Sequence, residues 1–167
     1  MTRGTLYAIT EKLVVETIEF NGGMFPAEHG KEVIAFMENC KVLNDFRIGL
    51  EKFNKDNHSH EGNLFNLHKR HDFIQQVKNV DTIDMTKDYS ELFFSDWTFW
   101  INLTKEDIVF KVDKGKYVPK NITDLVLKSG ECVAINYGGY ENHYKTSEEC
   151  EKVIIKRHKE AIAKGWI

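Results

Sequence analysis

Five short runs of β-branched and aromatic residues crowd the stretch between residues 97 and 137. The runs are WTFWINL, DIVFKV, KYV, LVLK and ECVAINY. Turn signals at Asp113-Lys114-Gly115 and Ser129-Gly130 separate them. Side chains alternate between the two faces of a strand, so runs of this kind predict a sheet with at least one buried face. An antiparallel meander is the simplest arrangement that this stretch predicts.

The N-terminal region predicts a β-hairpin. Two extended runs, Thr5 to Thr10 and Leu13 to Phe20, meet at Glu11-Lys12. Asn21-Gly22-Gly23 then ends the hairpin, because glycine supplies the positive φ of a sharp turn. Pro26 follows, just ahead of a helical pattern.

Two helices are predicted next. The first runs from about Glu28 to Glu38. The second ends near Asn54, with Asn44 as its cap. One face of this second helix is formed by residues at the i, i+4, i+7 spacing, namely Phe46, Leu50 and Phe53.

Residues 146–166 predict an amphipathic helix. Thr146 and Glu149 stand in capping-box spacing at its start, and Gly165 marks its end. The apolar stripe of this helix consists of Cys150, Val153, Ile154 and Ala161.

The middle of the chain predicts short elements of mixed type. LFNLH predicts a short strand, HDFIQQVKNV a short helix, and TKDYSELFF another helix. The order is therefore hairpin, helices, sheet and final helix, which indicates an α+β fold rather than alternating parallel βαβ units. The length of 167 residues fits one domain covering residues 1–167.

Charge, apolar run length and cysteine content indicate which partners and which cellular compartment to expect. The formal charge is −3, so the chain lacks the basic excess that neutralises a phosphate backbone, and nucleic acid is not an expected direct partner. The apolar runs fall short of the ~20 residues that cross a bilayer, so no membrane association is expected. Three cysteines at wide spacing and the lack of a secretory signal indicate a cytoplasmic protein. The oligomeric state is left open.

The run HSHEGNLFNLHKRH concentrates side chains able to bind a metal. It contains His58, His60, His68 and His71. Zinc prefers about four nitrogen, sulfur or carboxylate ligands, so these histidines form a candidate structural zinc site. The alternative is that they are surface histidines on a polar loop, since their spacing matches no known zinc signature.

Three enzymatic alternatives stay open. A metal-dependent hydrolase would use the same histidines, with Glu61 or Asp72 as base. An N-terminal-nucleophile hydrolase would use Thr2 after removal of Met1. A cysteine nucleophile would most simply be Cys40, since Cys132 and Cys150 fall on patterns typical of buried positions.

Aromatic residues provide a candidate binding surface. In a strand that starts at Trp97, Trp100 falls on the opposite face from Trp97 and Phe99, where it is either an exposed contact residue or covered by packing. Tyr137 and Tyr140 flank a Gly-Gly pair after the last strand and form a candidate binding tip.

MTRGTLYAIT followed by EFNGGMFPAEHGKEVIAFM resembles the start of small phage and prophage proteins of Gram-positive bacteria. In those proteins a hairpin headed by Thr-Arg-Gly precedes a Gly-Lys-Glu helix. The resemblance covers about the first quarter of the chain. In class and size the chain is similar to type II-A anti-CRISPR proteins, and no residue role carries over from them.

The resemblance implies a phage-encoded inhibitor that binds a host defence protein. Its most plausible target is the RNA-guided nuclease of a type II CRISPR system, in the cytoplasm of the bacterial host. An acidic face of the inhibitor would compete with nucleic acid for the basic channel of such a nuclease.

Overall fold

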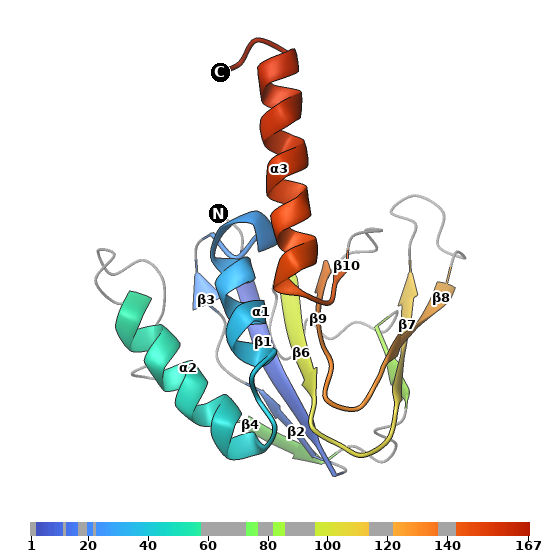
Figure 1. Ribbon diagram of the computed structural model, residues 1–167. Helices are drawn as coiled ribbons and strands as arrows, with labels where there is room; N and C mark the ends of the chain where they lie inside the picture. The colour runs from blue at the N-terminus through green and yellow to red at the C-terminus, as the bar shows by residue number, and fades with distance from the viewer. Residues whose placement is uncertain are drawn as a thin grey trace.

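The computed structural model describes residues 3–11, 13–16, 20–21, 23–57, 73–76, 82–85, 96–113, 122–136 and 143–167. Helices and strands are both present in these ranges, and helices cover one side of a sheet (Figure 1). The α+β class predicted from the sequence is thus confirmed.

Two sheets contain the strands. The seven-stranded sheet has the order β10-β9-β6-β1-β2-β4, and β3 pairs with β1. Its strands are β1 (Arg3–Thr10), β2 (Leu13–Glu16), β3 (Phe20–Asn21), β4 (Phe73–Gln76), β6 (Trp97–Asn102), β9 (Cys132–Asn136) and β10 (His143–Tyr144). The three-stranded sheet has the order β5-β7-β8. Its strands are β5 (Thr82–Asp84), β7 (Ile108–Asp113) and β8 (Ile122–Leu127).

The N-terminal hairpin is confirmed. β1 and β2 are antiparallel, and Thr10 pairs with Leu13, which places the turn at the predicted position. The described part of the second predicted run consists of β2 and Phe20 of β3, which also pairs with β1, and residues 17–19 lie outside the described residues. The hairpin occupies the interior of the large sheet, because β1 also pairs with β6.

The strands predicted as one meander are instead divided between the two sheets. β6 pairs in parallel with β1 and antiparallel with β9, whereas β7 and β8 form an antiparallel pair in the smaller sheet. Asn102 explains where the chain leaves the large sheet. Its buried amide nitrogen donates to the carbonyl oxygens of Glu106 at 2.8 Å and Leu127 at 3.1 Å. One side chain therefore joins the connection from β6 to β7 with the end of β8, where the chain returns toward β9.

Residues 73–76 correct the prediction of a helix in HDFIQQVKNV. They form β4, which pairs antiparallel with β2, so that Ile74 lies opposite Val15. Pairing with a distant strand overrides the local pattern here. The segments predicted as LFNLH, TKDYSELFF and KYV lie outside the described residues.

The helices follow the predictions with shifted ends. A single wide helical turn, η1 (Pro26–Gly30), leads into α1 (Lys31–Met37), and together they cover the first predicted helix. The second is α2 (Leu43–Asn57) and the last is α3 (Ser147–Ala163).

The predicted cap of α2 was wrong. Asn44 is exposed, and Asp45 instead accepts hydrogen bonds from the backbone amides of Lys41 at 2.8 Å and Val42 at 3.1 Å. A carboxylate in the first turn can reach back to the free amides before the helix, which is the second half of a capping box.

The large sheet separates two apolar cores, which gives three layers (Figure 1). The first core lies between this sheet and the helices, where Leu6, Trp97 and Phe99 meet Ile34 and Phe46. The second lies between the two sheets, where Tyr7, Ile9, Trp100, Phe110 and Leu127 pack together. Because side chains alternate between the two faces of β6, Trp97 and Phe99 lie in the first core and Trp100 lies in the second.

Candidate functional site

The start of α3 is firmly attached to the rest of the protein. Thr146 Oγ1 accepts a hydrogen bond from the Glu149 amide at 3.1 Å, and the Glu149 carboxylate accepts one from the Lys145 amide. Glu38, just after α1, accepts from both the backbone nitrogen of Ser147 at 2.6 Å and its Oγ at 2.9 Å. These bonds satisfy amides that the first turn of a helix leaves without an intrahelical partner.

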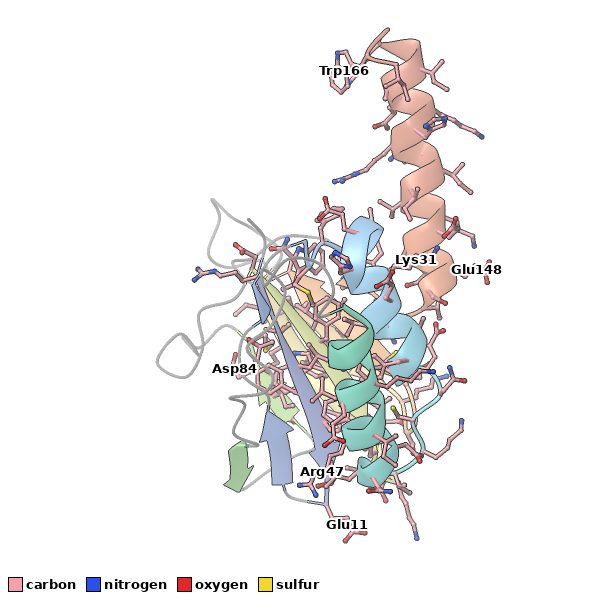
Figure 2. All side chains as sticks on the ribbon, turned by 90° about the vertical axis from the view of Figure 1, so that its left-hand side faces the viewer. Glu11, Lys31, Arg47, Asp84, Glu148 and Trp166 are labelled. Atoms are coloured by element: carbon pink, nitrogen blue, oxygen red, sulfur yellow. The ribbon has the colours of Figure 1, made fainter. Side chains whose placement is uncertain are left out.

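Three further contacts hold the first turns of α3. Cys150 is fully buried in the core beneath the helices. Glu151 forms an ion pair with Lys31 of α1. Figure 2 shows Lys31 beside the start of α3. The guanidinium of Arg157 lies 4.0 Å from the centroid of the Phe25 ring. We call residues 147–157, which carry these contacts, the proximal turns.

Beyond Arg157 the helix leaves the rest of the protein. Figure 1 shows α3 extending well past both sheets, with the C-terminus at its tip. Every residue from 158 to 167 except Ala161 is exposed. Figure 2 places Trp166 at the far end, away from Glu11, Arg47 and Asp84.

Large apolar side chains are exposed on α3 from Ile155, near the end of the proximal turns, to the tip of the projection. Their exposed fractions are 48% for Ile155, 54% for Ile162, 72% for Trp166 and 71% for Ile167. Exposed apolar residues that stand singly are common, but several on one projecting element are typical of an interaction site.

The end of α3 is ordered by its own backbone. The amide of Trp166 donates to the carbonyl of Ala161 at 2.9 Å, and the amide of Gly165 donates to that of Ile162 at 3.0 Å. Gly165 has a φ of +70°, so this is a Schellman motif with glycine in the left-handed position. Lys164 Nζ lies 4.7 Å from the centroid of the Trp166 ring. These hydrogen bonds hold the backbone of Trp166 in place, while its ring stays mostly exposed.

The C-terminal part of the chain, from Lys152 onward, is also strongly basic. Residues 152–167 contain five lysine or arginine residues and one glutamate, a formal charge of +4. Since the whole chain carries −3, the preceding 151 residues carry −7. We define the distal surface as the four exposed apolar residues together with the lysines around them, namely Ile155, Ile162, Trp166, Ile167, Lys152, Lys156, Lys159 and Lys164.

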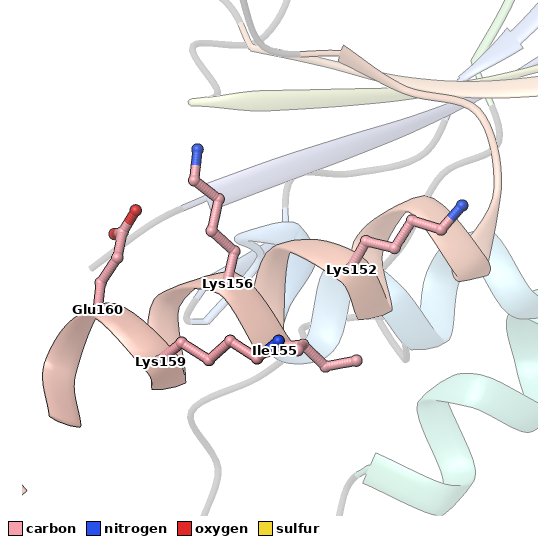
Figure 3. Close-up of a pocket in the computed structure, with 5 residues that line it drawn as sticks. All are labelled: Lys152, Ile155, Lys156, Lys159 and Glu160. Atoms are coloured by element: carbon pink, nitrogen blue, oxygen red, sulfur yellow. The ribbon is translucent and has the colours of Figure 1, made fainter. Parts of the chain in front are cut away.

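A shallow hollow of about 360 Å³ lies on this surface. Its lining consists of side chains that all stand out from α3, as Figure 3 shows, namely Lys152, Ile155, Lys156, Lys159 and Glu160. Because one helix supplies the whole lining, the hollow has no opposite wall that could enclose a small molecule. The geometry therefore fits a helix that is received by a partner better than a pocket that receives a ligand.

The candidate metal ligands belong to a part of the chain outside the described ranges. His58, His60, His68 and His71 all lie outside the described residues, as do Glu61, Asp72 and Thr2. Within the described ranges, no three His, Cys, Asp or Glu side chains form a group that could hold a metal ion. The candidate binding residues Tyr137 and Tyr140 also lie outside these ranges.

Trp100 is not an exposed contact residue, which corrects one alternative considered for it. Only 5% of its surface is exposed, because the smaller sheet covers that face of β6. Its ring stacks on Tyr7 with centroids 4.0 Å apart and meets Phe110 edge-on at 5.2 Å. The indole nitrogen donates to Thr98 Oγ1 at 2.9 Å, so this tryptophan is a fully satisfied core residue.

The three cysteines are free and buried. Burial, with a further contribution from Asp45, raises the pKa of Cys40 to about 11. Burial likewise raises the pKa of Cys132 and of Cys150 to about 12. A thiolate is the nucleophilic form of cysteine, so these protonated thiols are poor nucleophiles at neutral pH.

The predicted stripe of α3 is only part of its apolar surface. Cys150 is buried, and the other three members, Val153, Ile154 and Ala161, are partly buried. The distal surface was missed because Ile155 and Ile162 fall off that stripe. Their separation of seven residues, two helical turns, was the available signal for a second apolar face.

Comparisons with known proteins found no similar protein: no family model, curated protein or solved structure matches the chain. Among the helices in the described ranges, none is long and apolar enough to span a membrane.

Proposed function

We propose that the protein acts by binding another protein, and that it is a phage-encoded inhibitor of a host defence protein. One observation carries the binding function: α3 projects from the fold, and Ile155, Ile162 and Trp166 are exposed along it and at its tip. Tryptophan is among the residues most enriched at binding hot spots. The resemblance of the N-terminal quarter to phage proteins supplies the inhibitor class.

The RNA-guided nuclease of a type II CRISPR system is the first target to test. Such nucleases hold nucleic acid in positively charged channels. The first 151 residues carry a formal charge of −7, which favours contact with such a channel. The basic projection would then contact an acidic region of the same nuclease.

The test is cleavage of target DNA by a guide-loaded type II nuclease, with and without the purified protein. The expected result is slower cleavage with the wild-type protein and a loss of at least about tenfold in potency for Ile162→Asp, equivalent to 1.4 kcal/mol. Ile122→Asp is the matched control, because Ile122 is 49% exposed but belongs to β8.

Two outcomes would count against this function. Unchanged cleavage with the wild-type protein across nucleases from several bacteria would remove the proposed target. Equal loss of potency in Ile162→Asp and Ile122→Asp would remove the projecting helix as the contact element.

Zinc remains part of the proposal as a structural ion held by His58, His60, His68 and His71. Binding of a structural metal contributes directly to folding, so chelation should lower the melting temperature of a zinc-loaded sample. The supporting measurement is zinc content by elemental analysis together with melting curves before and after chelator. A metal-free preparation with an unchanged melting temperature would exclude the ion.

A further inference from the structure

We propose that the distal surface of α3 inserts into an apolar groove with an acidic rim on the partner protein. This inference rests on the proposed protein-binding function and specifies the chemistry of the partner. The apolar side chains would fill the groove, and the surrounding lysines would meet the acidic rim.

The spacing of the apolar residues fits recognition of a helix in a groove. Ile155 and Ile162 lie two turns apart on one face of α3, and Trp166 follows four residues later. Helices that bind in grooves present anchors at the i, i+3, i+4 and i+7 positions of one face. With 48% and 54% of their surfaces exposed, both isoleucines still have area to bury.

The charges around these apolar anchors indicate which charge the rim of the partner's groove should carry. Lys152, Lys156 and Lys159 line the hollow that contains Ile155, together with one acidic residue, Glu160, and Lys164 lies against Trp166. Lys152 also forms an ion pair with Glu148 at 3.0 Å. With a formal charge of +4 on residues 152–167, a basic groove would be disfavoured, whereas carboxylates at the rim of the groove would attract the helix.

The helix is already in a form suited to binding. The bonds of Glu38 and Thr146 fix its start, and the Schellman motif around Gly165 fixes its end. Binding of an ordered element avoids much of the conformational entropy that a disordered segment loses.

A flat anionic surface fits α3 less well than a groove. Glu148, Ile155 and Ile162 are spaced by seven residues and share one face, and Glu148 is exposed. A membrane of anionic lipids lying along this face would meet the Glu148 carboxylate near the start of the helix. A groove that receives the helix from Ile155 onward would not.

Trp166 provides a direct optical test. It is 72% exposed, whereas Trp97 and Trp100 are 1% and 5% exposed, so binding at the tip should change the emission of Trp166 selectively. Three anionic probes would be titrated into the full-length protein: calcium-loaded calmodulin, as a model receptor with an acidic, apolar groove; vesicles of phosphatidylcholine and phosphatidylserine; and duplex DNA.

The expected result is a saturable blue shift with calmodulin that requires calcium and weakens with added salt. Ile155→Asp and Ile162→Asp should each reduce the affinity at least about tenfold, and the matched control Ile122→Asp should leave it unchanged. Circular dichroism of each variant would confirm that α3 still forms.

Other results would overturn the proposal. A stronger shift with vesicles or DNA than with calmodulin would assign the surface to lipid or nucleic acid. The proposal would be contradicted if calmodulin caused no shift. It would also be contradicted if Ile122→Asp lowered the affinity as much as Ile155→Asp and Ile162→Asp do. Since none of these probes is a nuclease, these results are independent of whether the protein inhibits one.

Discussion

The two ends of α3 belong to one continuous helix but face different surroundings. In the proximal turns, Cys150 is fully buried, and Glu38, Lys31 and Phe25 contact the helix from elements far away in the sequence. In the distal turns, Ile162 and Trp166 are mostly exposed. Apolar residues at both ends therefore do different work: those at the start stabilise the fold, and those at the tip are available to a partner.

This difference shows how a helix can extend beyond its own core. An isolated helix of fewer than about 12 residues is only marginally stable in water. The distal turns are supported because the proximal turns are already fixed and helix formation propagates from them. A capped end then limits fraying at the tip.

The largest expected effect comes from a charge in the proximal core. Cys150→Asp would bury a carboxylate at a site with 0% exposure, which should lower the free energy of unfolding by more than about 3 kcal/mol. Ile162→Asp, on the same helix, should change it by less than about 0.5 kcal/mol. Urea unfolding followed by circular dichroism would measure both. Similar losses in the two variants would show that the two ends are not different.

Alkaline pH should also act on the core beneath the proximal turns, which contains Cys132 and Cys150. Burial raises the pKa of Cys132 and Cys150 to about 12, above the ordinary value of 9.0 for a thiol. The two thiols therefore bind their protons more strongly in the folded state than in the unfolded state. Stability should be unaffected below pH 9 and should fall as the pH rises from there toward 12.

Urea unfolding midpoints measured from pH 8 to pH 11 would check this dependence. A Cys132→Ala/Cys150→Ala variant should lose less stability over that range than the wild type. An identical decline in the variant would assign the effect to other groups.

A medium effect is expected at the cap of α3. Glu38→Ala removes the acceptor for both the backbone nitrogen and the hydroxyl of Ser147, so stability should fall by about 1–2 kcal/mol. Glu160→Ala, at an exposed distal position, is the matched control and should stay within about 0.5 kcal/mol of the wild type. A larger effect for Glu160→Ala would mean that the distal turns pack against the fold.

The smallest effect on global stability is expected at the tip. Gly165 has a φ of +70°, where an L-residue costs about 1 kcal/mol, so Gly165→Ala should loosen the last turn. Amide hydrogen exchange near residues 162–166 should speed up severalfold while the melting temperature stays nearly unchanged. Unchanged exchange would show that the Schellman motif does not order Trp166.

Local signals in the sequence predicted local structure well. Thr146 and Glu149 cap α3, and Gly165 ends it, because each feature involves residues within one or two turns. The hairpin turn between Thr10 and Leu13 is correct for the same reason. These contacts depend on neighbours in the chain, which a sequence pattern displays directly.

Long-range pairing was harder to predict. The parallel pairing of β1 with β6 joins residues about 90 positions apart, and β4 pairs with β2 across nearly 60. A repeated apolar pattern indicates that a strand has two buried faces but not which layer covers each face. Trp100 shows this, since its face of β6 is covered by the smaller sheet.

The candidate site was missed for a related reason. Because α3 has apolar residues on two sides, the sequence does not tell which side meets the core. Only the position of α1 and η1 against Cys150 and Arg157 shows that Ile155 and Ile162 face outward.

The most direct test is a paired measurement on the double variant Ile155→Asp/Ile162→Asp. Its urea unfolding midpoint and its inhibition of target cleavage by a type II nuclease would be measured on the same preparation. A midpoint like that of the wild type, together with lost inhibition, is the predicted result. A midpoint as low as that of Cys150→Asp, or full inhibition by the double variant, would contradict a distal surface reserved for a partner.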